Sequence, residues 1–90
     1  MQKSKKKKRV LIYDEEGLSL LAKRLKEIRA EKGFTQEDLA YESDIALSQI
    51  ARIETSRINP TVSTIFRIAR TLDIPVSELF NFKFQKKQNI

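Results

Sequence analysis

The 90-residue chain contains no cysteine, no histidine and no tryptophan. Without cysteine it can form no disulfide, which favours a reducing cytoplasm as its location. Without histidine or cysteine it also lacks the usual zinc and copper ligands, His-based catalytic triads and cysteine nucleophiles. No clustered set of acids, bases or nucleophiles stands outside the structural positions. We therefore expect no metal, no cofactor, no small-molecule ligand and no enzymatic activity.

Long apolar runs are also missing from the sequence. No run reaches the 18 or so residues that a membrane-spanning helix needs, so we expect no membrane partner. The longest apolar run near the N-terminus is Val10–Tyr13, which is too short for the core of a signal peptide. A chain of this length has room for one domain with a single core.

Positive charge is present but unevenly placed, within a net charge of +6. Residues 1–16 and residues 83–90 each sum to +3, whereas residues 17–82 hold nine basic and nine acidic side chains. We therefore expect a basic, disordered N-terminal tail (1–16), a helix-turn-helix domain (17–82) and a basic C-terminal tail (83–90). Charge alone leaves two interpretations open, contact with nucleic acid or tails that only aid solubility.

Helical spacing of apolar residues predicts five helices in a compact bundle, hence an all-α fold. Gly33 is placed to end the first helix, and Thr35 and Thr61 are placed as N-caps of the second and fourth. A break at Asp44-Ile45 separates the second helix from the third. The expected helices cover residues 18–32, 36–43, 46–55, 62–72 and 75–80.

Both ends of the domain carry strand-like patterns, Val10–Tyr13 and the alternating Phe80, Phe82 and Phe84. A short two-stranded ribbon, within or between subunits, is one interpretation. The favoured alternative is that these residues only pack onto the helices.

Two short helices joined by a tight turn suit DNA recognition, because the major groove admits one helix and the preceding helix braces it. At 100° per residue, Ala46, Ile50 and Ile53 of the third helix fall on one face and should point into the core. The opposite face carries small or polar side chains that can approach base edges: Ser48, Ala51, Arg52 and Thr55. An ordinary amphipathic surface helix would show the same pattern.

Four segments in order carry a resemblance to a known family. They are Arg29–Ala40 (RAEKGFTQEDLA), Ile50–Glu54 (IARIE), Asn59–Thr61 (NPT) and Leu72–Phe80 (LDIPVSELF). Together they resemble the Cro/C1-type (XRE-like) helix-turn-helix regulators, whose fold is the lambda-repressor-like helical bundle. Residues 35–45 are especially similar to the small controller proteins of restriction–modification systems.

The resemblance implies roles for individual residues. It implies base contacts for Leu47, Ser48, Gln49 and Arg52, and phosphate contacts for Gln36, Thr55, Ser56 and Arg57. It also implies a buried ion pair between Arg29 and Glu54, which the helical wheel supports because Glu54 falls near the core face. The family binds DNA as a homodimer, and we expect the dimer surface to include Val76, Leu79, Phe80 and Phe82.

Three positions depart from the family pattern. Asp44 and Ser56 stand where the family usually has glycine, and Ala46 stands where a Ser or Thr usually caps the recognition helix. The leading interpretation is a sequence-specific regulator, a repressor or autoregulator, that binds a double-stranded DNA operator as a homodimer. The alternative is an interaction module or antitoxin-type partner protein that keeps the fold.

Overall fold

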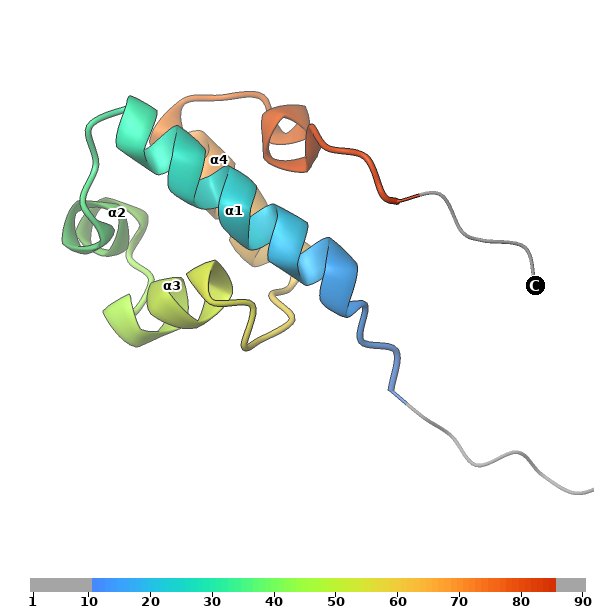
Figure 1. Cartoon of the computed structure of the whole chain (residues 1–90). Helices are drawn as coiled ribbons and strands as arrows, with labels where there is room; N and C mark the ends of the chain where they lie inside the picture. Colours follow the sequence, from blue (N-terminus) through green and yellow to red (C-terminus); the bar gives the residue numbers. More distant parts are fainter. Residues whose placement is uncertain (1–10, 86–90) are drawn as a thin grey trace, which may run out of the picture.

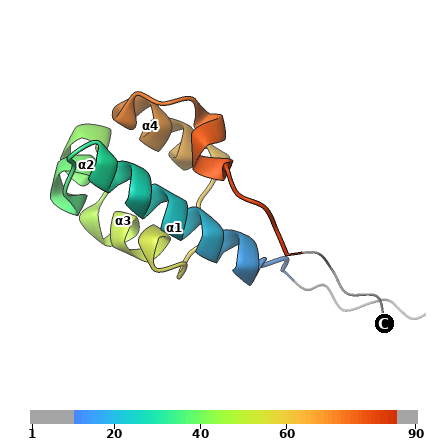
Figure 2. The same ribbon diagram turned by 45° about the horizontal axis from the view of Figure 1, so that its top comes forward.

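The computed structural model describes residues 11–85. In order along the chain it contains α1 (Glu15–Glu31), α2 (Gln36–Ser43), α3 (Leu47–Glu54), α4 (Val62–Leu72) and a 3₁₀ turn, η1 (Val76–Phe80). Helix α1 is the long central element, and α3 and α4 lie along different sides of it (Figures 1 and 2). The all-helical fold expected from the sequence is confirmed.

The core lies between α1 and the four shorter elements, and every element contributes to it. Its most deeply buried apolar side chains are Leu25, Leu39, Ile50, Ile53, Ile68, Leu72 and Leu79. Each fully buried Leu or Ile contributes about 1.5–3 kcal/mol of transfer free energy. The core therefore fixes the inner faces of α2 and α3, and so determines which faces remain outside.

Two expectations about element boundaries need correction. The fifth helix is a 3₁₀ turn held by bonds from the Glu78 amide to the Pro75 carbonyl (2.9 Å) and from Asn81 to Glu78 (3.4 Å), and Pro75 precedes it. Short pieces of helix such as this one commonly take the tighter 3₁₀ form. Helix α1 begins at Glu15, earlier than expected, because the Asp14 carboxylate accepts a hydrogen bond from the Gly17 amide.

No strand forms within residues 11–85, so the described parts of the two strand-like segments form no ribbon. Phe82 packs against the core, as the favoured alternative predicted, and its ring lies 5.9 Å from that of Phe84. Leu11 and Ile12 do not pack onto helices, since they are 93% and 89% exposed. Val10, the run Lys5–Arg9 and the last five residues lie outside the described part of the chain.

Four residues at helix ends adopt left-handed backbone conformations: Gly33 (φ 77°), Asp44 (58°), Ser56 (53°) and Asp73 (57°). Asp44 and Ser56 are the two positions where the family usually has glycine. Their backbones still adopt the geometry that glycine favours, at the steric cost that a Cβ atom imposes there. Both turns therefore take a left-handed conformation without glycine.

Within residues 11–85, no helix is both long enough and apolar enough to cross a membrane.

The helix N-termini differ in how they are capped, which gives a first prediction. Asp14, Thr35 and Thr61 each accept a backbone hydrogen bond, whereas Ala46, the N-cap residue of α3, has no side-chain acceptor. Ala46→Ser should therefore raise the free energy of unfolding by about 1 kcal/mol. Urea unfolding measures the change, with Thr61→Ala as a control of opposite sign. An unchanged urea midpoint for Ala46→Ser would show that solvent already satisfies this helix end.

Candidate nucleic-acid interface

The outer face of α3 is exposed along its length. Leu47, in the first turn, is 42% exposed, and Ser48, Arg52 and Thr55 are exposed as well. Ile50 and Ile53, on the other side, are 0% and 2% exposed. For these residues the inner apolar face and the outer polar face are the ones expected from the helical wheel, but Ala51, expected on the outer face, is half-buried.

Gln49 and Ala46 lie at the margins of this exposed face. Gln49 is half-buried, at the side of the face. Ala46 was expected to point into the core but is exposed. It lies before the first helical residue, with an extended backbone (φ −58°, ψ 139°), so the 100° wheel does not apply to it.

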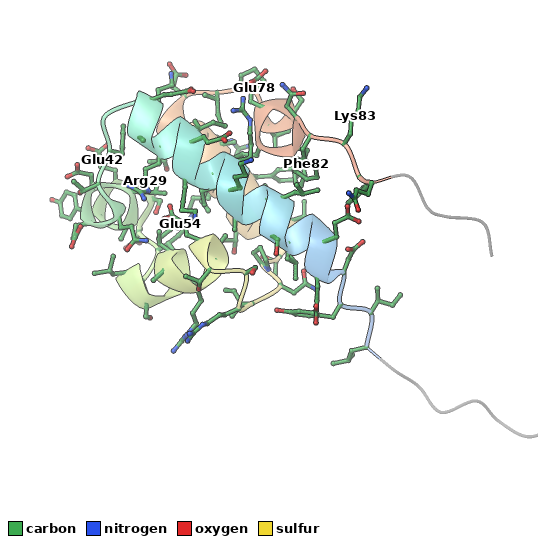
Figure 3. All side chains as sticks on the ribbon, in the orientation of Figure 1. Arg29, Glu42, Glu54, Glu78, Phe82 and Lys83 are labelled. Carbon is green, nitrogen blue, oxygen red and sulfur yellow. The ribbon has the colours of Figure 1, made fainter. Side chains whose placement is uncertain are left out.

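Behind the exposed face lies a buried ion pair between α1 and α3. Arg29 Nε lies 2.6 Å from Glu54 Oε2, and Arg29 Nη2 donates to Glu54 Oε1 at 2.9 Å. The Glu54 side chain is 1% exposed and that of Arg29 is 17% exposed. Figure 3 shows the two side chains meeting between the helices. The hydrogen bonds that Arg29 donates to Glu54, together with the negative charge of Glu54, raise the pKa of the Arg29 guanidinium above its usual value.

Gln36, the first residue of α2, takes part in the same network. Its Nε2 atom donates to Glu54 Oε1 at 2.9 Å, which sequence reasoning did not anticipate. Arg29 also donates from Nη1 to the carbonyl oxygen of Phe34 at 2.9 Å. Side chains or backbone from α1, the turn before α2, α2 and α3 therefore meet around one ion pair.

The start of α2 is further stabilised by a reciprocal pair of bonds. The Asp38 amide donates to Thr35 Oγ1, and the Thr35 amide donates to Asp38 Oδ2, both at 2.9 Å. The hydrogen bond from the Thr35 backbone amide, followed by the Thr35 side chain, holds the pKa of the Asp38 carboxyl below its usual value. The end of α2 that carries Gln36 is thus fixed both by its cap and by Glu54.

The loop that follows α3 begins with the three residues expected to contact phosphate. Thr55 Oγ1 donates to the Ala51 carbonyl at 2.9 Å, and Ser56 Oγ donates to the Thr55 carbonyl at 2.7 Å. The Arg57 amide donates to the Arg52 carbonyl at 2.8 Å. Because these groups already have partners, the exposed guanidinium of Arg57 is the strongest donor that the loop offers to an anion.

The four residues expected at a dimer surface differ in exposure. Phe80 is 48% exposed and Val76 is half-buried, but Leu79 is 0% exposed and belongs to the core, so it cannot contact a partner. Phe82 also turns partly inward against the core. Val62 and Phe66, one turn apart on α4, are apolar side chains that are 64% and 43% exposed, and sequence reasoning did not single them out as exposed. Their spacing of four residues places them on one face of the helix.

Residues 25–79 match the model of the helix-turn-helix family HTH_3. The chain belongs to this family. The Cro/C1-type resemblance is thereby confirmed, and α2 and α3 are the two helices of the helix-turn-helix, with Asp44 in the turn between them.

Two curated relatives illustrate the range of the family. The immunity repressor protein of Bacillus phage phi105 is 39% identical over 59 residues, which cover 66% of this chain and 41% of the repressor. An uncharacterized HTH-type transcriptional regulator of Archaeoglobus fulgidus is 34% identical over 59 residues, which cover 66% of this chain and 84% of that protein. The chain thus spans about two fifths of the length of the phage repressor and most of the archaeal protein.

Two solved structures are similar to this helix-turn-helix protein over 70% of its length, and both are restriction–modification controller proteins. The controller C.AhdI from Aeromonas hydrophila has a TM-score of 0.69 and 36% identity, and the match covers 96% of its chain. The controller C.Esp1396I has a TM-score of 0.66 and 38% identity, with 83% covered. A further structure holds the C.Esp1396I tetramer in complex with its natural 35 base-pair operator.

The buried ion pair of the helix-turn-helix gives a second prediction. Arg29→Met leaves the Glu54 carboxylate buried without its charged partner, which typically costs about 3–5 kcal/mol. Guanidinium unfolding at neutral pH should show this decrease in the free energy of unfolding. Lys26→Met, at an exposed position of the same helix, is the matched control and should stay within about 0.5 kcal/mol of the unmodified protein. A decrease below about 1 kcal/mol for Arg29→Met would mean that Glu54 is not held by this pair.

Proposed function

We propose that the protein is a homodimeric regulator of transcription that binds a double-stranded DNA operator and reads its major groove with α3. The observation that carries the proposal is the exposed outer face of α3, which presents small and polar side chains and the guanidinium of Arg52. This helix is the second helix of a helix-turn-helix of the HTH_3 family. Repression or control of its own promoter is the expected outcome of operator binding. In a bacterial or archaeal cell this activity would be cytoplasmic.

Base reading is assigned to Leu47, Ser48, Gln49 and Arg52. Arg52 lies one helical turn beyond Ser48 on the exposed side of α3, and a guanidinium can donate to guanine O6 and N7 together. Small neighbours such as Ser48 let the helix approach the base edges closely. Leu47 fits apolar contact with a thymine methyl group.

Phosphate contact is assigned to Gln36, Thr55, Ser56 and Arg57, of which Arg57 is the one charged side chain. The internal bonds of Thr55 and Ser56 mean that their main contribution is to hold the loop in position. Gln36 keeps one Nε2 hydrogen and its Oε1 atom available beside its bond to Glu54. Its amide therefore approaches the DNA in an orientation that the buried ion pair sets.

Dimerisation is assigned to an apolar surface made by Val62 and Phe66 of α4 with Val76 and Phe80 of η1, called the α4–η1 surface below. Val62 and Phe80 line one hollow of about 390 Å³, and Phe66 and Val76 line a second of about 260 Å³. In a dimer, the two α3 helices would read half-sites about 34–36 Å apart, the spacing of helix-turn-helix dimers on DNA. The tetramer that C.Esp1396I forms on its operator supports an oligomeric mode of binding.

A pair of arginine variants tests base reading against phosphate contact. Arg52→Ala should weaken binding to the selected operator by about 1–3 kcal/mol and affect random duplex much less, because base contacts carry the specificity. Arg57→Ala should weaken both duplexes by similar factors. Each variant is titrated against operator and scrambled duplex at one salt concentration, the operator being obtained by selection from random DNA.

The arginine comparison has two outcomes that contradict the proposal. Equal weakening on both duplexes for Arg52→Ala would make Arg52 a phosphate contact. No weakening for either variant would remove α3 from the binding surface and favour an interaction module. Gln36→Ala is a poorer probe of phosphate contact, because it also removes a hydrogen bond from buried Glu54.

The dimer surface gives a further prediction. Phe66→Glu places a charge in the α4–η1 surface and should raise the dimer dissociation constant by about tenfold or more, equivalent to about 1.4 kcal/mol. Sedimentation equilibrium measures it, and Tyr41→Glu on the exposed face of α2 is the control. A dimer constant that Phe66→Glu leaves unchanged would place the interface elsewhere.

A further inference from the structure

A contact between α1 and η1 joins the central helix of the domain to its proposed dimer surface. Arg24 Nε donates to the carbonyl oxygen of Glu78, and Arg24 Nη2 donates to Glu78 Oε1, both at 2.8 Å. A longer contact within α1 joins Arg24 Nη1 to Glu27 Oε1 at 3.4 Å. The Arg24 side chain is 20% exposed, so most of it is shielded from water. One side chain therefore holds both the backbone and the carboxylate of Glu78.

The turn that Arg24 holds has few hydrogen bonds of its own. The Glu78 amide donates to the Pro75 carbonyl at 2.9 Å, and the Asn81 amide donates to the Glu78 carbonyl at a long 3.4 Å. Pro75, which precedes η1, supplies no side-chain cap. Leu79 anchors the turn in the core, but one buried side chain does not fix the direction of the residues beside it. Within residues 11–85, the hydrogen bonds between α1 and η1 all come from Arg24.

The residues on either side of Glu78 form the η1 part of the α4–η1 surface. Val76 and Phe80 each lie two positions from Glu78, and Phe80 is 48% exposed while Val76 is half-buried. A displacement of the Glu78 backbone would move both side chains, because they belong to the same short turn. The two bonds from Arg24 therefore set where this part of the surface lies relative to α1.

Helix α1 holds the recognition helix through a second arginine. Arg29, five residues after Arg24, forms the buried ion pair with Glu54 of α3. Five residues of an α-helix correspond to about 7.5 Å along its axis and about 140° around it, so the two arginines project to different sides. Figures 1 and 2 show η1 and α3 on different sides of α1. Through these two contacts, α1 connects the proposed dimer surface to the helix that reads DNA.

We propose that Arg24 is a positioning residue that determines which spacing between half-sites the dimer accepts. The separation and rotation between two α3 helices depend on how each dimer surface lies relative to the α3 of its own protomer. Arg24 fixes η1 against α1, and Arg29 fixes α3 against the same helix. The favoured partner is a duplex whose two half-sites stand at one fixed separation. The inference rests on the proposed function, because it requires the α4–η1 surface to join two copies of the chain.

The test compares duplexes that differ only in the spacing of their half-sites. The selected operator is compared with duplexes that have one base pair added or removed between the half-sites, which moves one half-site by about 3.4 Å and rotates it by about 34–36°. A duplex with a single half-site measures the DNA-reading face of one protomer alone. Dissociation constants are measured for the full-length chain and for Arg24→Gln. Lys23→Gln, at an exposed neighbouring position of α1, is the matched control that removes the same charge.

The quantity that decides is the spacing preference, defined as the ratio of the dissociation constants for the altered and the selected spacing. Arg24→Gln should reduce this ratio by about three- to tenfold, the range that loss of one hydrogen bond produces. Its affinity for the single half-site should change by less than about twofold, because the groups that hold α3 are distant from the substitution. A loss of stability alone would weaken binding to every duplex by one factor and leave the ratio unchanged. Lys23→Gln should leave the ratio unchanged as well.

A second variant keeps the test available if Arg24→Gln does not fold. Glu78→Gln weakens the same contact from the side of η1 and leaves α1 unaltered. It should reduce the spacing preference less than Arg24→Gln, because the Glu78 carbonyl still accepts a hydrogen bond from Arg24 Nε.

The outcomes distinguish a failure of this inference from a failure of the proposed function. A spacing preference that Arg24→Gln leaves unchanged would overturn the role of Arg24 and leave the proposed function intact; if that variant does not fold, an unchanged preference in Glu78→Gln would do the same. An equal loss of affinity on all duplexes, the single half-site included, would overturn it as well. If the unmodified chain binds duplex but prefers no spacing, the dimeric mode of reading and this inference are both wrong.

Discussion

The buried carboxylate of Glu54 is the constraint on which the arrangement of the helix-turn-helix depends. It lies at the C-terminal end of α3, where the helix dipole disfavours negative charge, and its side chain is almost fully withdrawn from water. A carboxylate in that place is tolerable only with donors around it. Arg29 supplies two and Gln36 supplies a third. Satisfying one charge therefore fixes α1, the start of α2 and the end of α3 relative to one another.

The inward position of Glu54 also determines the charge of the outer face. Glu54 is the one acidic residue of α3, and its burial leaves Arg52 as the ionised group that the helix presents outward. Acidic side chains of α2 are exposed elsewhere, and Figure 3 shows Glu42 on the outer side of that helix. Residues 17–82 are neutral overall, but their charges are separated in space. Glu54, the acid of α3, is buried, and Arg52 of the same helix is exposed.

Features that depend on local pattern could be predicted from the sequence, and features that depend on distant contacts could not. The apolar spacing of α1 and α4, the caps at Thr35 and Thr61, and the inward position of Glu54 all follow from periodicity and residue type. An apolar residue in a short terminal element suggests a surface role for Leu79, yet packing against α1 and α4 makes it core. The contact of Tyr13 with Ser56 spans 43 positions and has no periodic signal. The bond of Gln36 to Glu54 likewise depends on how α2 meets α3.

The left-handed residues at helix ends have a consequence for the unfolded chain. Only two of the 90 residues are glycine, and Asp44, Ser56 and Asp73 occupy left-handed conformations that glycine would adopt without strain. A side chain at such a position costs native enthalpy, but it also restricts the backbone before folding and so reduces the entropy decrease on ordering. Each of the three residues therefore has two opposing effects: strain destabilises the native state, and a narrower range of conformations raises the free energy of the denatured state. At positive φ the strain exceeds this entropic gain, so the three residues lower the net stability of a domain whose stability is a small difference between large terms.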